Sequence, residues 1–264
     1  MRNIFGLAVL FLVIACDDKK GADSTKMAGA YSLYRQVVND GSKDSLIDRN
    51  QLKIYTDNHI MYASSTGTDS LANYGLGRYE MKNDKIYEYI FYRSSEGTVS
   101  QKADTAILQI EPSETGYMQA IEEIEVAGKK YKLSEQYDKI GKGNSSPLDG
   151  AWKQTINHYI TNKGDTTTIS NPTQFKVYQS GAYIWAQTYK DSLNKSVSVF
   201  GYGTFEMDGK NKSRETTWNS TFRSALMGKT YELALEFDGN DKYKQTIEFR
   251  TGEKSIEMYE RLKE

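Results

Sequence analysis

Short segments in which apolar and polar residues alternate run along most of the chain. The clearest one places Leu233, Leu235 and Phe237 at every second position, with acidic residues and one alanine between them. A period of two is typical of a β-strand that buries one face. Turn-forming pairs such as Asp57-Asn58 and Asp208-Gly209 separate these segments. No apolar period indicates a helix longer than a turn or two, so the pattern predicts an all-β chain.

The same pattern occurs twice along the chain. Six short motifs recur in the same order, and the offset between the copies drifts between 121 and 126 residues. The matched segments are 29–31 with 150–152, 51–55 with 174–178, 60–63 with 183–186, 75–81 with 201–207, 117–119 with 243–245, and 137–140 with 259–262. A unit of this length is a domain rather than a solenoid repeat, so we expect two similar domains in tandem.

Turn residues divide each copy into eight short strands. They are expected near 29–38, 51–56, 59–64, 75–82, 85–93, 104–111, 116–127 and 130–139, and near 150–160, 173–179, 182–189, 198–208, 211–220, 229–238, 242–250 and 253–262. Eight antiparallel strands favour closure into an up-and-down barrel, which leaves no unpaired edge. A sandwich is the competing architecture.

The start of the chain has the parts of an export signal. Arg2 precedes an apolar run that ends at Ala15, shorter than the about 20 residues a helix needs to cross a bilayer. The only cysteine, Cys16, follows at once, and residues 13–16 resemble the lipobox of bacterial lipoproteins. The resemblance implies that Cys16 becomes the first mature residue and carries several acyl chains, which make anchoring stable. The alternative is an unmodified cysteine inside a membrane anchor.

These observations together predict five parts. Residues 1–15 form a signal peptide, 16–27 a lipidated tether, 28–140 the first barrel, 141–147 a linker and 148–264 the second barrel.

Composition excludes several classes of function. The 264 residues carry 34 basic and 35 acidic side chains, a formal net charge of −1, whereas nucleic acid calls for a basic surface. One cysteine and two histidines leave little material for a metal site. The chain has no P-loop, no G-x-S-x-G and no H-E-x-x-H. We therefore expect no nucleic acid partner, no metal and no cofactor.

The first and last strands of each copy carry a shared signature. Its residues are Gly150, Trp152 and Arg261 in the second copy and Gly29, Tyr31 and Lys139 in the first. This resembles the lipocalin-type (calycin) barrel signature, in which glycine-x-tryptophan opens the first strand and a basic side chain of the last strand packs over the indole. A cation over an aromatic ring contributes about 0.5–2 kcal/mol. The chain resembles the lipocalin-like lipoproteins of Bacteroidetes, which implies an outer-membrane, lipid-anchored protein with a small-molecule-binding or accessory role.

Candidate ligand-binding residues in the second copy have polar or aromatic side chains. Gln154 and His158 share the strand parity of Trp152, so both are expected to point into the second barrel, where a polar group orients a ligand. The alternative for His158 is a hydrogen-bonded histidine near the rim. Trp185 lines either a cavity or the core.

A second set of candidates occupies equivalent strand positions in the two copies. It consists of Glu88 and Glu215, Glu135 and Glu257, and Tyr137 and Tyr259. An inward phenol beside a cation can bind a carboxylate ligand, and the alternative is a structural ion pair at the seam. A one-residue change of register would invert the side that Arg261 faces, and the sequence leaves this open.

We expect a monomeric binding protein whose partners are the membrane, through its lipid, and a small apolar or amphipathic ligand in at least one barrel. Two other classes fit the sequence. One is a non-catalytic module that binds a partner protein or glycan through its exterior, which an exposed aromatic patch would favour. The other is an isomerase or hydrolase working in a barrel cavity, which needs a buried carboxylate or His158 with a shifted pKa. We rank the enzyme last.

Overall fold

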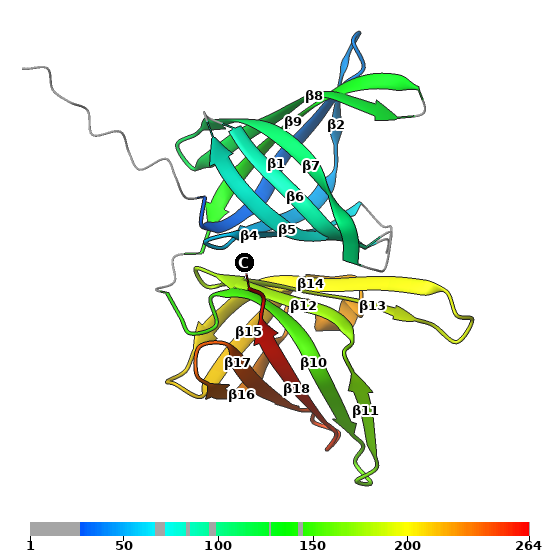
Figure 1. The fold of residues 1–264 in the computed structure, drawn as a ribbon, viewed down its shortest axis with the longest axis vertical. Coiled ribbons are helices and arrows are strands. Elements are labelled where there is room, and N and C mark those ends of the chain that lie inside the picture. The colour runs from blue at the N-terminus through cyan, green and yellow to red at the C-terminus, as the bar shows by residue number, and fades with distance from the viewer. Residues whose placement is uncertain are drawn as a thin grey trace, which may run out of the picture.

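The computed structural model describes residues 27–66, 72–82, 85–94, 99–126, 128–141 and 145–263. They form two β-barrels, called here barrel 1 and barrel 2, which lie one above the other in Figure 1. The predicted signal peptide, Cys16 and the tether up to residue 26 lie outside the described residues, as do residues 142–144 of the predicted linker. Within the described ranges, no helix has the length and apolar character needed to span a membrane.

The strands follow one another around each barrel. Barrel 1 consists of β1 (Gly29–Asn39), β2 (Asp44–Ile47), β3 (Arg49–Tyr55), β4 (His59–Thr66), β5 (Asn73–Lys82), β6 (Lys85–Arg93), β7 (Val99–Pro112), β8 (Gly116–Val126) and β9 (Lys129–Ile140). Barrel 2 consists of β10 (Gly150–Ile160), β11 (Thr166–Ser170), β12 (Thr173–Gln179), β13 (Ala182–Lys190), β14 (Ser196–Met207), β15 (Lys212–Ser220), the short 3-10 helix η1 (Ser224–Leu226), β16 (Thr230–Asp238), β17 (Lys242–Glu248) and β18 (Lys254–Arg261).

Each sheet closes on itself, because its first strand pairs with its last. β1 pairs with both β3 and β9, and β10 pairs with both β12 and β18, all antiparallel. Neighbours in sequence are otherwise neighbours in the sheet. The predicted fold class, all-β with two tandem eight-stranded antiparallel barrels, is confirmed, and the sandwich is excluded.

The expectation of eight separate strands per copy missed one segment in each. β2 pairs with the second half of β1, and β11 pairs with the second half of β10. Only Asp48 separates β2 from β3, so these two act as one interrupted strand of the closed barrel. Both extra segments are short; β11 is exposed throughout, and β2 alternates between exposed and half-buried residues. With no face fully buried, they lack the alternation that predicts a strand.

A β-bulge in the first strand of each barrel changes which side chains face inward. The register shifts between Leu33 and Arg35 in β1 and between Gln154 and Ile156 in β10. One extra residue reverses the parity of everything after it. His158 therefore does not point into barrel 2, where Asn157 takes the inward position. The alternative of a hydrogen-bonded histidine holds: Nδ1 of His158 lies 2.8 Å from the Thr168 hydroxyl of β11, and the pair is exposed.

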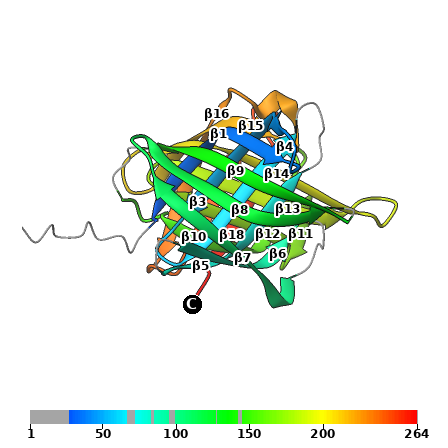
Figure 2. The ribbon, with the colours of Figure 1, turned by 90° about the horizontal axis from the view of Figure 1, so that it is seen from above.

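The two barrels pack together through equivalent outer faces. One apolar cluster joins side chains from β3, β4 and β5 to side chains from β12, β13 and β14, and Figure 2 shows barrel 1 lying over barrel 2. Leu52 and Phe175 are matched positions in it, as are Met61 and Ile184. The Tyr92 ring lies 5.0 Å from that of Phe175. The faces that turn away from each barrel's own interior thus form a shared core.

The seam of barrel 2 is closed by Arg261. Its guanidinium lies over the Trp152 ring at 4.0 Å from the centroid, and Trp152 is fully buried. The guanidinium also donates to the carbonyls of Asp149, Asn240 and Pro147, at 2.6, 2.8 and 3.2 Å. Since Tyr259 and Arg261 share a strand face and Tyr259 is buried, Arg261 lies on the inward face at the end of the barrel.

Gly150 makes this arrangement possible. A Cβ at this position would lie 2.0 Å from a guanidinium nitrogen of Arg261, and the backbone has φ +131°, which side chains rarely adopt. Barrel 1 has the looser version that the sequence predicts, with the Lys139 ammonium 5.9 Å from the Tyr31 centroid and Gly29 beside it. The signature thus closes both seams, more tightly in barrel 2.

Replacing Arg261 by alanine should destabilise barrel 2 far more than the matched change destabilises barrel 1. Arg261→Ala removes the cation from the Trp152 ring and leaves three carbonyls without their donor, so we expect a loss of about 2 kcal/mol of unfolding free energy. Lys139→Ala should cost about 0.5 kcal/mol or less, because its cation is distant and more hydrated. Urea unfolding followed by circular dichroism measures both, and equal losses would contradict this account of the seam.

Candidate functional site

A buried lysine stands at the centre of barrel 2. The Nζ of Lys176, on β12, donates to both Oε atoms of Glu215 on β15, at 3.1 and 3.3 Å. It also donates to the Tyr178 hydroxyl and to Oε1 of Gln245 on β17, each at 3.1 Å. The Tyr178 hydroxyl in turn donates to Glu215 at 2.6 Å. A charge taken out of water needs such partners, and three strands supply them.

Glu257, on β18, is the second acid of this interior. Its Oε2 accepts from Gln245 at 2.7 Å and from the Tyr259 hydroxyl at 2.6 Å, and its Oε1 accepts from the Ser255 hydroxyl at 3.2 Å. Gln174 donates to the Tyr259 oxygen at 2.7 Å. Within the described part of the chain, no lysine or arginine forms an ion pair with Glu257. The groups that donate hydrogen bonds to Glu257, one amide and two hydroxyls, are therefore all uncharged.

Barrel 1 contains the same lysine and first acid. The Nζ of Lys53, on β3, donates to Glu88 at 3.1 Å and to Gln119 at 3.2 Å. The Tyr55 hydroxyl donates to Glu88 at 2.5 Å. All four side chains are buried, and each occupies the strand position of its counterpart in barrel 2. Removing one partner of a buried pair of this kind typically costs about 3–5 kcal/mol.

The second acid of barrel 1, Glu135, has one partner that Glu257 lacks. Gln119 and the Tyr137 hydroxyl both donate to Glu135, as their counterparts do in barrel 2. In addition, Gln36 of β1 donates its side-chain amide to Oε1 at 2.5 Å. The position of Gln36 is occupied by Asn157 in barrel 2, whose Oδ1 lies 3.1 Å from the Ser255 hydroxyl oxygen. That hydroxyl has one proton, so Asn157 and Oε1 of Glu257 compete for it. The shorter amide leaves Oε1 of Glu257 without that donor.

The sequence contains a signal for this network that the candidate residues do not include. The matched segments 51–55 and 174–178 both read glutamine, lysine and tyrosine at every second position. Alternate positions share one face of a strand. Polar residues that recur on the face shared with a buried tyrosine indicate an interior network. Lys176, Gln174 and Gln245 could have been identified in this way.

Burial shifts the titration of the tyrosines in both barrels. Desolvation raises the pKa of Tyr178 and Tyr259 well above the usual range, and the nearby carboxylates of Glu215 and Glu257 raise it further. In barrel 1 the same two causes, with Glu135 as the acid, raise the pKa of Tyr137. These phenols therefore remain neutral donors at any physiological pH.

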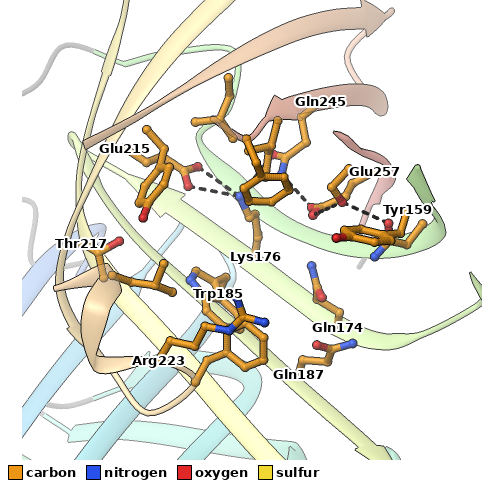
Figure 3. A pocket seen from close by; sticks show the side chains of 18 of the residues that line it. Tyr159, Gln174, Lys176, Trp185, Gln187, Glu215, Thr217, Arg223, Gln245 and Glu257 are labelled. Carbon is orange, nitrogen blue, oxygen red and sulfur yellow. Dashed lines mark hydrogen bonds and ion pairs between the residues drawn. The ribbon is translucent and has the colours of Figure 1, made fainter. Parts of the chain in front are cut away.

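Barrel 2 has a cavity of about 370 Å³ beside its polar network, between Lys176 and Glu257 on one side and Trp185 and Arg223 on the other (Figure 3). Lys176, Glu215 and Glu257 line one side of it, and Trp185 and Arg223 also border it. The remaining lining residues are Asn157, Tyr159, Gln174, Tyr183, Gln187, Thr217, Phe222, Leu226, Tyr231, Leu233, Gln245, Ile247, Phe249, Glu253 and Ser255. A concave wall that combines aromatic and aliphatic side chains with convergent polar groups is a common form of a small-molecule site.

The rim of the cavity lies at the end of barrel 2 opposite the Arg261 seam. Trp152 stands near the start of β10, whereas Tyr159 stands near its end and lines the cavity. Phe222 and Phe249 are exposed at this rim, 41% and 37%. Arg223 is exposed, and its guanidinium lies 5.0 Å from the Phe222 ring. Hydrogen bonds from Thr251 and from the Tyr159 phenol, together with the charge of Arg223, lower the pKa of Glu253.

Smaller side chains in barrel 2 account for part of this space. Ser255 occupies the position of Leu133 in barrel 1, as the pairing of each with the first strand shows. Thr217 likewise replaces Ile90, each opposite an equivalent glycine. Beside Glu257, the exchanges of Leu133 for Ser255 and of Gln36 for Asn157 remove side-chain volume, although other lining positions are larger in barrel 2 than in barrel 1.

The other candidates lie at several distances from the cavity. Glu215, Glu257 and Trp185 line it, and Tyr259 lies behind Glu257. Gln154 points inward and donates to Tyr259 at 3.3 Å, and it is fully buried outside the lining. Glu88, Glu135 and Tyr137 are buried in barrel 1.

Two other hollows lie apart from the polar networks of the barrels. One, of about 390 Å³, lies along β1, β8 and β9 of barrel 1 and includes Arg35, Met118 and Lys132, with none of the buried network residues in its lining. The other, of about 620 Å³, lies at the junction of the barrels and includes Asp57, Asp149 and Arg261. Burial raises the pKa of Asp149. Among the residues that the structure describes, no cluster of three or more histidine, cysteine or acidic side chains is arranged to hold a metal ion.

Comparison with known proteins gives structural similarity and no sequence match. A lipocalin-like protein from Bacteroides uniformis ATCC 8492 is similar to 44% of this chain over 100% of its own, with 14% identity and a TM-score of 0.30. A redesigned β barrel is similar to 45% of this chain over 100% of its own, with 15% identity and a TM-score of 0.30. No family model and no curated protein matches the chain.

The buried tyrosines should make alkaline unfolding abrupt. Burial raises the pKa well above the ordinary value of 10.0 in six of them, Tyr55, Tyr117, Tyr137, Tyr178, Tyr243 and Tyr259. Above pH 10 the unfolded chain loses these protons and the folded chain keeps them, so stability falls by up to about 1.4 kcal/mol per pH unit for each tyrosine. Below pH 10 this contribution is fully present.

The measurement is tyrosinate absorbance recorded together with circular dichroism during a titration above pH 10. We expect most of the absorbance to appear in one cooperative step that coincides with loss of the β signal. A gradual rise centred near pH 10 with an unchanged β signal would contradict the burial of these phenols.

Proposed function

We propose that this chain is a lipid-anchored protein of the bacterial envelope whose barrel 2 binds a small amphipathic molecule. Barrel 1 has the same fold with a buried network, and in this proposal it supports barrel 2. Binding, without a chemical reaction, is the proposed activity of the cavity.

The cavity of barrel 2 is the observation that carries the proposal. Its volume of about 370 Å³ lies within the range of small-molecule sites. Its inner side offers hydrogen-bonding groups on Gln174, Gln187 and Glu257, whereas the rim is aromatic at Phe222 and Phe249. A molecule with a polar end and an apolar body would satisfy both parts.

The anchoring part of the proposal rests on the sequence. An apolar run that ends at Ala15 is followed directly by the only cysteine. Met27, the first described residue, packs against the interior cluster of barrel 1. A lipid on Cys16 would therefore attach the protein to the membrane through barrel 1, with the cavity in the other barrel.

Refilling the cavity with the residues of barrel 1 should abolish binding. Ser255→Leu and Asn157→Gln together install the side chains that Leu133 and Gln36 have at the matched positions. We expect this double variant to remain folded and to lose binding of the neutral apolar dye N-phenyl-1-naphthylamine by at least about ten-fold, because its side chains occupy the space. Dye fluorescence and native mass spectrometry measure the loss.

The matched control is Leu193→Ser, which changes an exposed apolar residue outside the cavity lining. It should bind the dye as the unaltered protein does. If the refilled variant binds as well as the control, the dye lies elsewhere and barrel 2 is not the site. If the unaltered protein binds neither the dye nor any member of a lipid and metabolite panel, ligand binding as the function is refuted.

Replacing Cys16 by serine should release the protein from the membrane. A serine cannot form the thioether that holds the lipid, and the remaining apolar run is shorter than a bilayer span. Membrane fractionation and intact mass of the mature protein measure the outcome. An unaltered chain whose mature mass lacks acyl chains, or a variant that is still processed and membrane-bound, would contradict lipid anchoring.

A further inference from the structure

The interior charges of barrel 2 do not cancel. Counted at their formal charges, Lys176 contributes +1 and Glu215 and Glu257 contribute −1 each, so the three sum to −1. Lys176 forms an ion pair with Glu215, so the charges of these two residues compensate each other. At the rim, Arg223 and Glu253 have opposite charges and both reach solvent. The uncompensated charge is therefore that of Glu257, which borders the cavity.

Barrel 1 shows that this sum alone does not require a ligand. Lys53, Glu88 and Glu135 have the same charges, and all three are buried. What differs is the environment of the second acid. The amide of Gln36 donates to Glu135, whereas Oε1 of Glu257 has only the Ser255 hydroxyl at 3.2 Å, with a cavity beside it. Barrel 1 thus satisfies its acid internally, and barrel 2 leaves its acid accessible.

The cavity wall differs between the barrels in a second, independent way. Three lining positions are aromatic in barrel 2 and aliphatic in barrel 1, namely Tyr159 for Val38, Tyr183 for Ile60 and Tyr231 for Ala106. At a fourth position, Trp185 of barrel 2 has a larger ring than Tyr62 of barrel 1. The face of an aromatic ring attracts a cation, most strongly when the cation is desolvated. Enrichment in aromatic rings around an uncompensated carboxylate is the composition of a site for an organic cation.

On these two observations we propose that barrel 2 selects an amphipathic amine: its ammonium group pairs with Glu257, and its apolar body lies against the ring of Trp185 and its aromatic neighbours. This inference rests on the function proposed above and adds the charge of the ligand. The ammonium supplies the donor that Gln36 supplies in barrel 1. An anionic ligand is disfavoured, because it would meet the carboxylate of Glu257 in a partly desolvated site.

Three probes with one body and different end groups test the proposal: 3-phenylpropylamine, 3-phenylpropan-1-ol and 3-phenylpropanoate. Calorimetric titration of the protein at neutral pH gives the three affinities. We expect the amine to bind at least about ten-fold more tightly than the alcohol, and the carboxylate to bind more weakly than the alcohol. In Glu257→Gln, the amine and the alcohol should bind with similar affinity, because the paired charge is gone.

The matched control is Glu135→Gln, which makes the same change in barrel 1 and should leave the ratio of amine to alcohol affinity unaltered. An alcohol that binds as tightly as the amine, or a carboxylate that binds best, overturns the choice of a cation and leaves ligand binding in place. The choice of a cation is overturned in the same way if the protein binds N-phenyl-1-naphthylamine but none of the three probes. Only failure of the dye as well would refute the proposed function. The comparison within the unaltered protein is decisive even if Glu257→Gln does not fold.

Discussion

The rest of the structure depends on the hydrogen bonds that a buried lysine makes inside each barrel. The ammonium of Lys176 donates hydrogen bonds to acceptors on β12, β15 and β17, and Gln245 of β17 in turn donates to Glu257 on β18. A buried ammonium is tolerated only where its acceptors are in place. The network therefore fixes strands that lie across the barrel from one another, which backbone pairing between neighbours does not do, and it sets the polar side of the cavity.

Much of the fold follows from local pattern, and much of the site does not. Period-two alternation and turn residues are local, and they correctly indicated closed all-β barrels with Gly150, Trp152 and Arg261 at one seam. The facing of His158 depended on one bulged residue in β10, which alternation cannot reveal because the bulge adds a residue without changing the polarity pattern. The cavity depended on differences between equivalent positions, such as Ser255 and Leu133. Those differences acquire meaning only when the two copies are superimposed strand by strand.

The outer faces of the barrels explain why the two domains come as a pair. β3 to β5 carry Leu52, Ile54 and Met61 on the side away from their own interior, and β12 to β14 carry the matched apolar residues. Either barrel alone would expose this surface to water. Since both outer faces are buried against each other, β3 and β12 carry their apolar residues on the outer side and the network lysines Lys53 and Lys176 on the inner side. Their alternation is therefore reversed relative to that of Leu233 and Leu235, which face the interior of barrel 2.

Covalent joining of the two copies has a consequence for how they can differ. In a symmetric dimer of identical chains, every substitution occurs twice, so an exchange that hollows one subunit hollows both and weakens the assembly two times over. Here Leu133 and Gln36 persist in one half while Ser255 and Asn157 stand in the other. One half keeps the longer side chains of Leu133 and Gln36 at these positions, and in the other half the shorter Ser255 and Asn157 border the cavity beside Glu257.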